Sequence, residues 1–86
     1  MGRLYSGNLA AYKSALEGLE VLGCNVKITH EVVTERRVRA INIEVSMMTS
    51  GDMMGKESFM HYDDDVLFNT CTAWMRGLAE AISSWK

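Results

Sequence analysis

The chain has 86 residues, of which 48% are hydrophobic and 23% are charged, and its 9 basic and 11 acidic side chains give a formal net charge of −2. The length excludes a multi-domain enzyme, and the composition excludes a disordered tail, a collagen-like fibre and a disulfide-dense scaffold. We therefore expect one small globular domain that spans residues 1–86.

The charge and hydropathy patterns also limit where such a chain acts. An acidic balance disfavours bulk attraction to nucleic acid or to an anionic membrane. The longest uncharged run, residues 66–75, is too short to cross a bilayer, and the N-terminus lacks the apolar core of a secretory signal. Cys24 and Cys71 form no CxxC motif, so we expect two reduced, buried thiols. These features predict a cytoplasmic protein.

The first predicted helix covers about residues 8–22. Asn8 is a good N-cap because its side-chain oxygen can accept from the free N–H groups of the first turn. Apolar side chains then recur at steps of three and four, and Gly23 suits the position after the last turn. Gly18 inside the helix costs about 1 kcal/mol relative to alanine, so we expect it to permit the close approach of another element.

Three strands follow the helix. Period-two alternation of apolar and polar side chains predicts a hairpin of two strands, at about residues 25–34 and 38–48. A strong turn signal at residues 49–52 precedes a third strand, at about residues 54–62. The third strand has apolar bulk on both faces, in Phe59 and Met60, which is typical of a strand that is covered twice or that lies at an interface.

The second predicted helix covers about residues 64–84. We predict that Asp63 or Asp64 caps its start, where acidic side chains also suit the positive end of the helix dipole. Its apolar stripe runs for more than four turns, and we expect Trp74 and Leu78 in the middle of that stripe to be buried. The stripe consists of Leu67, Cys71, Trp74, Met75, Leu78, Ile82 and Trp85.

The predicted order α-β-β-β-α describes an α+β two-layer sandwich, with two helices on one face of a three-stranded antiparallel sheet. This order is similar to that of the double-stranded RNA-binding domain. In that family the start of the second helix carries a lysine-rich run that grips phosphates, whereas this chain has Asp63, Asp64 and Asp65 there, with the opposite charge. The resemblance covers the element order and no motif, so it implies a fold and carries no function.

Catalytic and metal-binding patterns are weak in this sequence. A metal site would need His30 and His61 to converge with the aspartates. Helix capping explains the aspartates without a metal, and a hydrogen-bonded position in the core or at its edge explains His30. Neither cysteine has an adjacent base, and no phosphate-binding loop or zinc spacing is found. We therefore expect no cofactor and no metal.

Two groups of side chains are candidate partner contacts. At the hairpin tip, Arg36, Arg37 and Arg39 can grip phosphates or carboxylates, or form a solvated turn balanced by nearby glutamates. The second group is rich in methionine, which fills cores and adapts to partner surfaces equally well. It consists of Met47, Met48, Met53, Met54, Phe59 and Met60.

The function predicted from these observations is that of a non-enzymatic protein–protein interaction module. It is a regulator or inhibitor that occupies a partner's surface, of the kind frequent in phages and mobile elements, such as an inhibitor of a host defence complex. A nucleic-acid-binding accessory protein that uses Arg36, Arg37 and Arg39 is the alternative, and a small metal-dependent enzyme comes third. The sheet face that the helices leave open is expected to be apolar and to carry Val33, Val38 and Ala40, or the other set of strand residues if the register is reversed, which predicts a homodimer.

Overall fold

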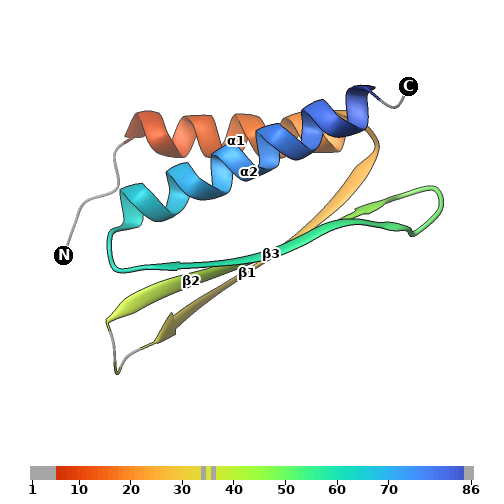
Figure 1. The fold of residues 1–86 in the computed structure, drawn as a ribbon. Coiled ribbons are helices and arrows are strands. Elements are labelled where there is room, and N and C mark those ends of the chain that lie inside the picture. Colours follow the sequence, from red (N-terminus) through yellow and green to blue (C-terminus); the bar gives the residue numbers. More distant parts are fainter. Residues whose placement is uncertain (1–5, 34, 36, 85–86) are drawn as a thin grey trace.

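The computed structural model describes residues 6–33, 35 and 37–84, and Figure 1 shows its five elements. The predicted order of helix, three strands and helix is confirmed, and each predicted boundary lies within two residues of the observed one. The elements are α1 (Ser6–Val21), β1 (Cys24–Val33), β2 (Val38–Met47), β3 (Met53–His61) and α2 (Asp64–Ser84).

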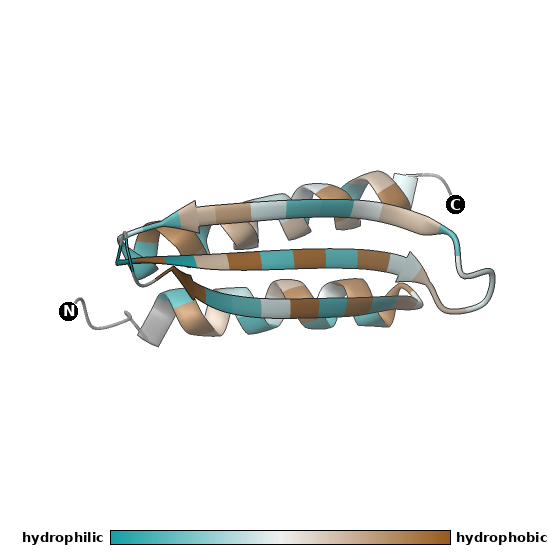
Figure 2. Ribbon diagram, turned by 90° about the horizontal axis from the view of Figure 1, so that it is seen from below, coloured by the Kyte–Doolittle hydropathy of each residue, from teal (hydrophilic) through white to brown (hydrophobic). Residues whose placement is uncertain are grey.

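The three strands form one antiparallel sheet in the order β1-β2-β3. Both helices cover the same face of it, so the predicted two-layer α+β sandwich is confirmed (Figure 1). Seen from the open side in Figure 2, α1 lies behind β1 and α2 lies behind β3. This arrangement leaves one whole face of the sheet without a covering layer.

The core lies between the helices and the inner face of the sheet. Alternate residues of β2, namely Ile41, Ile43 and Val45, are completely buried there. β1 contributes Cys24, and the helices contribute Leu19 and Met75. Because the period of a strand is two, the same alternation directs the polar residues of β1 and β2 to the open face.

The start of α1 differs from the prediction. The helix begins at Ser6, so Asn8 lies inside it and is not its N-cap. The Asn8 amide nitrogen donates instead to a carboxylate oxygen of Asp65, over 3.2 Å, and links the first turns of the two helices. The Asn8 side chain therefore bonds to the other helix and does not cap its own helix, contrary to the prediction from the sequence pattern. Gly23 follows the helix with φ of 87°, as expected for a glycine in this position.

The close approach expected at Gly18 occurs at another glycine. No atom outside the helix lies within 4 Å of a Cβ built at Gly18, because that residue faces solvent, so the prediction there is wrong. A Cβ at Gly55 of β3 would lie 3.1 Å from Cζ2 of Trp74 and 3.2 Å from Cδ2 of Leu78. Gly55 is therefore the position that lets α2 approach the sheet.

The apolar stripe of α2 is buried unevenly. Leu67, Cys71, Met75 and Ile82 are buried, whereas Trp74 and Leu78 are only half-buried, contrary to the prediction. The cause is the narrow sheet: α2 lies over its edge strand β3, so the outer side of the stripe reaches solvent. The Trp74 ring packs against that of Phe59 at a centroid distance of 6.1 Å. Trp85 lies outside the described residues.

The two helices contact each other through an aromatic pair. The rings of Tyr12 and Phe68 meet edge to face, with centroids 4.8 Å apart. Burial of Phe68 and Thr72 on this side of α2 widens its apolar stripe beyond the predicted set. Among the described residues, no helix is long and apolar enough to cross a membrane.

Candidate protein-binding surface

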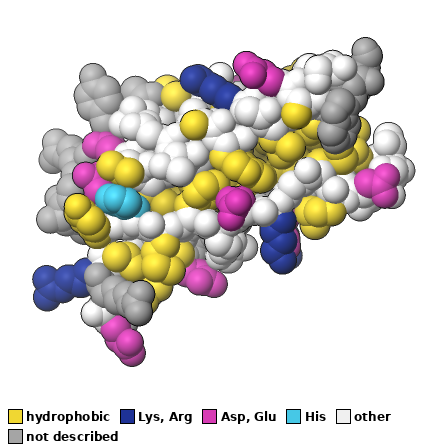
Figure 3. Space-filling view, viewed as in Figure 1, with side chains coloured by type: hydrophobic (Ala, Val, Ile, Leu, Met, Phe, Trp, Pro, Cys, Tyr) yellow, Lys and Arg dark blue, Asp and Glu magenta, His cyan; other side chains and the backbone are white. Residues whose placement is uncertain are grey.

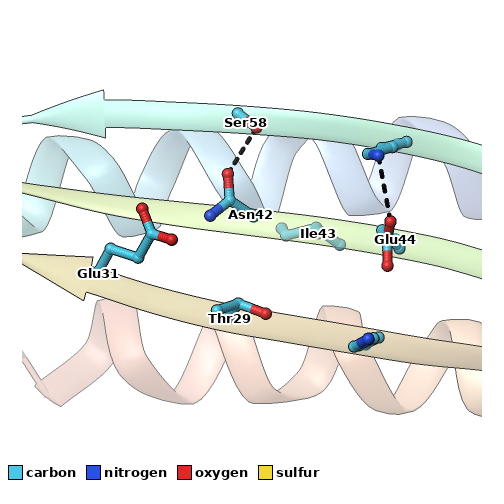
Figure 4. Close-up of a pocket in the computed structure, with 8 residues that line it drawn as sticks. Thr29, Glu31, Asn42, Ile43, Glu44 and Ser58 are labelled. Carbon is cyan, nitrogen blue, oxygen red and sulfur yellow. Dashed lines mark hydrogen bonds and ion pairs between the residues drawn. The ribbon is translucent and has the colours of Figure 1, made fainter.

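The open face of the sheet carries Val33, Val38 and Ala40 at one end, as predicted, but its middle is polar, which corrects the prediction that the face as a whole is apolar. In its middle, one row across the three strands contains Thr29, Asn42 and Ser58, and the next contains Lys27, Glu44 and Lys56. These side chains line a shallow depression of ≈ 390 Å³ (Figure 4). The period-two pattern that buries one face of β1 and β2 places the polar set on the other face.

The polar side chains of this face are bonded to each other. The Ser58 hydroxyl donates to the side-chain oxygen of Asn42 over 2.6 Å, and the Lys56 ammonium lies 3.3 Å from a carboxylate oxygen of Glu44 (Figure 4). Such exposed pairs contribute little to stability, and they leave few groups directed at a ligand. The depression therefore has the properties of a solvated sheet face.

Apolar side chains are exposed at one end of the sheet, beside the β1–β2 turn. Val32, Met60 and Tyr62 are 64%, 54% and 78% exposed, and Val33 and Val38 are half-buried. Val33 pairs with Val38 across the hairpin, and Ala40 of β2 pairs with Met60 of β3. We call Val33, Val38, Met60 and Tyr62 the hairpin-end surface. Val32 lies beside it on the opposite face of the hairpin. Figure 3 shows hydrophobic side chains at this end of the molecule, among acidic and basic ones.

The two described arginines of the predicted basic tip, Arg37 and Arg39, lie in different surroundings. Arg37 is exposed and has an unusual positive φ of 54°. The Arg39 guanidinium is directed toward α2, where its Nε lies 3.2 Å from a carboxylate oxygen of Asp64. Arg36 lies outside the described residues. Since Arg39 is paired and three aspartates lie beside it, this end is a poor match for a phosphate backbone.

The three aspartates have three different roles at the start of α2. A carboxylate oxygen of Asp63 accepts from the backbone N–H groups of Asp65 and Val66, over 2.9 and 3.3 Å, so Asp63 is the N-cap. Asp64 pairs with Arg39, and Asp65 accepts from Asn8. Of the two predicted capping residues, Asp63 therefore caps the helix, while Asp64 joins α2 to β2.

The cap at Asp63 leads to a testable expectation. Asp63→Ala should lower the free energy of unfolding by about 1 kcal/mol, because it leaves two N–H groups without their acceptor. Asp63→Asn should be nearly neutral, because the amide oxygen accepts the same bonds. Urea unfolding measures both variants, and equal losses for alanine and asparagine would contradict the capping role.

The methionine-rich group is divided between the core and the surface. Met47, Met54 and Phe59 are half-buried and pack against the core. Met48 and Met53 are exposed near the β2–β3 turn, whereas Met60 is exposed at the opposite end of β3. The expectation of one continuous apolar surface is therefore wrong. A β-bulge between Val45 and Ser46 shifts the register, which directs Met54 inward beside Gly55.

The two histidines share the inner face of the sheet but do not meet. His30 pairs with Ile41, whereas His61 pairs with Arg39, and the whole of β2 lies between them. The Nδ1 atom of His61 accepts from the backbone N–H of Asp63 over 2.9 Å, and its ring stacks on Tyr62. In the part of the chain that the structure describes, no three His, Cys, Asp or Glu side chains are placed to hold a metal ion.

The cysteines have the properties of buried structural thiols. Cys24 and Cys71 are buried and not joined in a disulfide, and the Sγ of Cys24 lies 3.8 Å from the Sδ of Met47. Burial raises the pKa of Cys71 to about 11, so its thiol is protonated at neutral pH and is a poor nucleophile. Burial, and secondarily the nearby Cys71, raises the pKa of Tyr12 to about 12.

These two groups should make the fold sensitive to alkali. Their pKa values in the folded chain, about 11 and about 12, lie above the ordinary values of 9.0 and 10.0. The unfolded chain therefore releases these protons first, and the free energy of unfolding should fall as pH rises from about 9 to about 12. Urea unfolding across this range should show a shallower fall for Tyr12→Phe than for the unmodified chain. Tyr62→Phe, at an exposed tyrosine, is the matched control, and equal slopes for the two variants would contradict the expectation.

Tyr12→Phe should also be neutral or stabilising near pH 7. The Tyr12 hydroxyl is buried and has no hydrogen-bond partner among the described residues. A buried hydroxyl without a partner costs about 1–3 kcal/mol, which the phenylalanine ring avoids while it keeps the contact with Phe68.

The sequence did not predict that Val32 and Tyr62 are exposed at the hairpin end of the molecule. Val32 belongs to the inner face by its alternation, yet it is exposed because the hairpin tip diverges from the helices (Figure 1). Tyr62 was assigned to the third strand, but it lies beyond the end of β3, in the link to α2. The alternation pattern continued through Tyr62 and gave no signal of this. The two-residue link between His61 and Asp64, in which a tyrosine has little structure to cover it, is seen only in the structure.

Comparisons with known proteins agree with an inhibitory role. Residues 1–86 match the family described as bacteriophage T7-like, gene 1.2. The chain is 38% identical to the Escherichia phage T7 protein named "Inhibitor of dGTPase", over 86 residues that cover all of both chains. It is also 32% identical to the "Gene 1.2 protein" of Enterobacteria phage T3, over 97 residues that cover all of this chain and 98% of the relative.

The predicted function is confirmed at the level of its class. The T7 relative is named as an inhibitor of an enzyme, which agrees with a phage-type regulator that acts on a protein partner. The family match spans the whole chain, and the T7 relative matches along its full length. The chain therefore belongs to the bacteriophage T7-like gene 1.2 family.

Proposed function

We propose that this chain is a non-enzymatic inhibitor that binds a dGTPase of a bacterial host in the cytoplasm and stops its hydrolysis of dGTP. The observation that carries the proposal is the 38% identity, over the full length of both chains, with a protein named as an inhibitor of dGTPase. Two proteins that are this similar over their full lengths share a fold, and they commonly bind the same kind of partner.

The chemistry of the described residues supports inhibition by contact. The Cys71 thiol is buried and protonated, and His30 and His61 lie apart on the sheet. On the open face of the sheet, Lys56 and Glu44 form an exposed ion pair. Exposed apolar side chains at the hairpin end are instead typical of a protein interface.

A direct test uses the purified chain and the dGTPase of a bacterium that the phage infects. Hydrolysis of dGTP should fall in proportion to the amount of chain added, until an equimolar amount stops it. The chain and the enzyme should also elute together in size-exclusion chromatography. The chain alone should hydrolyse no dGTP. An unchanged rate of hydrolysis with the chain in excess would contradict the proposal.

The homodimer stays a prediction, and the structure offers fewer surfaces through which two copies could associate than the sequence suggested. The open sheet face is mainly polar, and the edge strand β3 carries the charged side chains of Lys56 and Glu57, which discourage edge pairing. The remaining support is the exposure of Met48, Met53 and Met60. Light scattering at increasing concentration tests it: a dimer doubles the mass of 9.6 kDa, whereas a constant monomer mass contradicts it.

A further inference from the structure

We propose that the hairpin-end surface is the part of this chain that contacts the dGTPase, and that it fits a positively charged surface of that enzyme. This inference rests on the proposed function and extends it by naming the contact region and the chemistry of the surface that the partner presents. Three properties of this end of the molecule support it: exposed apolar area, ordered attachment and excess negative charge.

The first property is the apolar area. Met60 and Tyr62 are exposed large hydrophobic side chains, and Val32 and Val66 are exposed at the same end. Val21, Met48 and Met53 are exposed to a similar degree at the opposite end, so the apolar area supports the inference only together with the charge described below. The hairpin tip diverges from the helix layer, so neither of its faces is covered near the turn (Figure 1). When a small soluble protein exposes several large apolar side chains close together, these side chains commonly form an interface with a partner.

The second property is the ordered attachment of Tyr62 and of the link between β3 and α2 that carries it. The link from β3 to α2 is held by the Asp63 cap, by the hydrogen bond from the Asp63 N–H to His61 and by the stacking of His61 on Tyr62. The Arg39–Asp64 ion pair joins the same link to β2. A surface that is ordered before binding loses little conformational entropy when the partner arrives, so more of the contact energy appears as affinity.

The third property is the charge around the apolar side chains. Five carboxylates and two guanidinium groups of the described residues lie at this end, one guanidinium is paired with Asp64, and the sequence adds Arg36 next to Arg37, which leaves an excess of two acidic residues. The acidic residues are Glu31, Glu35, Asp63, Asp64 and Asp65, and the basic ones are Arg37 and Arg39. An enzyme that binds a nucleoside triphosphate has positive potential around its substrate site, which attracts an acidic partner. The hairpin end therefore complements such an enzyme in charge.

The experiment compares substitutions at the two ends of the molecule, with inhibition of the dGTPase and binding kinetics as readouts. Tyr62→Ala and Met60→Lys should each weaken binding by about tenfold or more, because aromatic and central apolar contacts dominate interface energies. Val21→Lys is the matched control, since it places the same charge at an exposed apolar side chain at the other end of α1, and it should leave inhibition unchanged. Urea unfolding of each variant separates loss of binding from loss of fold.

A second measurement tests the charge of the partner surface. The association rate of the unmodified chain should fall as salt is raised, and Glu31→Lys should lower that rate at low salt with less effect on dissociation. Full inhibition by folded Tyr62→Ala and Met60→Lys would overturn the inference and leave the proposed function intact. If these variants no longer form a homodimer but still inhibit the enzyme, the surface serves self-association, and the inference about enzyme contact is overturned. Absence of inhibition by the unmodified chain would overturn the proposed function and this inference together.

Discussion

Replacement of Ile43 by alanine is expected to lower the free energy of unfolding by about 2–5 kcal/mol, because it leaves a cavity in the middle of the core. Ile43 is completely buried at the centre of β2, between strands on both sides and beneath the helices. A domain of this size has a total stability on the order of 5–10 kcal/mol, so this one change removes a large share of it.

Val32→Ala is the matched control for Ile43→Ala. Val32 lies on the same face of the same sheet, but it is 64% exposed at the hairpin tip. Its truncation should therefore change the stability by about 0.5 kcal/mol or less. Urea unfolding with a common m-value compares the two variants. Similar losses would show that the sheet face under the helices is not the core.

Gly55→Val is expected to cost about 1–3 kcal/mol, because a branched side chain would have to fit between β3 and α2. The first added carbon would already lie 3.1 Å from the Trp74 ring and 3.2 Å from the Leu78 side chain. The loss should be seen as a lower midpoint of urea unfolding, in spite of the better strand propensity of valine.

A double-mutant cycle identifies the indole of Trp74 as the cause. In a Trp74→Ala background the valine at position 55 occupies the space that the indole leaves, so the cost of Gly55→Val should shrink or change sign. Gly18→Ala is the matched glycine control. It should stabilise the chain by about 0.5–1 kcal/mol, because Gly18 lies in a helix with open space around it. Additive losses at Gly55 and Trp74 would contradict the close packing of α2 on β3.

The fold was predictable because its signals are local. Alternation in residues 24–33 and 38–47 specifies two half-buried strands, and a stripe with period 3.6 specifies α2. The acidic run before α2 marks its start, since the Asp63 cap needs only the next three residues. Such patterns need no knowledge of what a segment packs against.

The features that escaped prediction depend on distant parts of the chain. Asn8 has the sequence of an N-cap, but its partner is Asp65, at the start of the other helix. The half-burial of Trp74 follows from the position of α2 over an edge strand, and the inward turn of Met54 follows from a bulge. Each of these depends on the width or register of the sheet, which no single segment encodes.

The candidate surface was predictable in part. Met60 and Arg37 were chosen from the sequence and are exposed at the hairpin end, but Met47, Met54 and Phe59 pack against the core. Polarizable methionines suit both environments, so composition alone cannot divide the group. The inhibitory class followed from the lack of catalytic motifs in a small acidic chain, whereas dGTPase is the enzyme named for the T7 relative and is a proposal for this chain.

The hairpin connectivity of the sheet has a consequence for the order of folding. Every strand pairs with its neighbour in sequence, so the sheet grows by two hairpins, and hairpins form within about 1–10 μs. The contact between the helices is different, because the Asn8–Asp65 hydrogen bond joins residues 57 positions apart. Closure of that long loop carries the largest entropy cost in the chain, and Tyr12 and Phe68 meet only after it. Each helix also packs on the strand next to it in sequence, so we expect the hairpins and these two local contacts to form early and the contact between the two helices to form last.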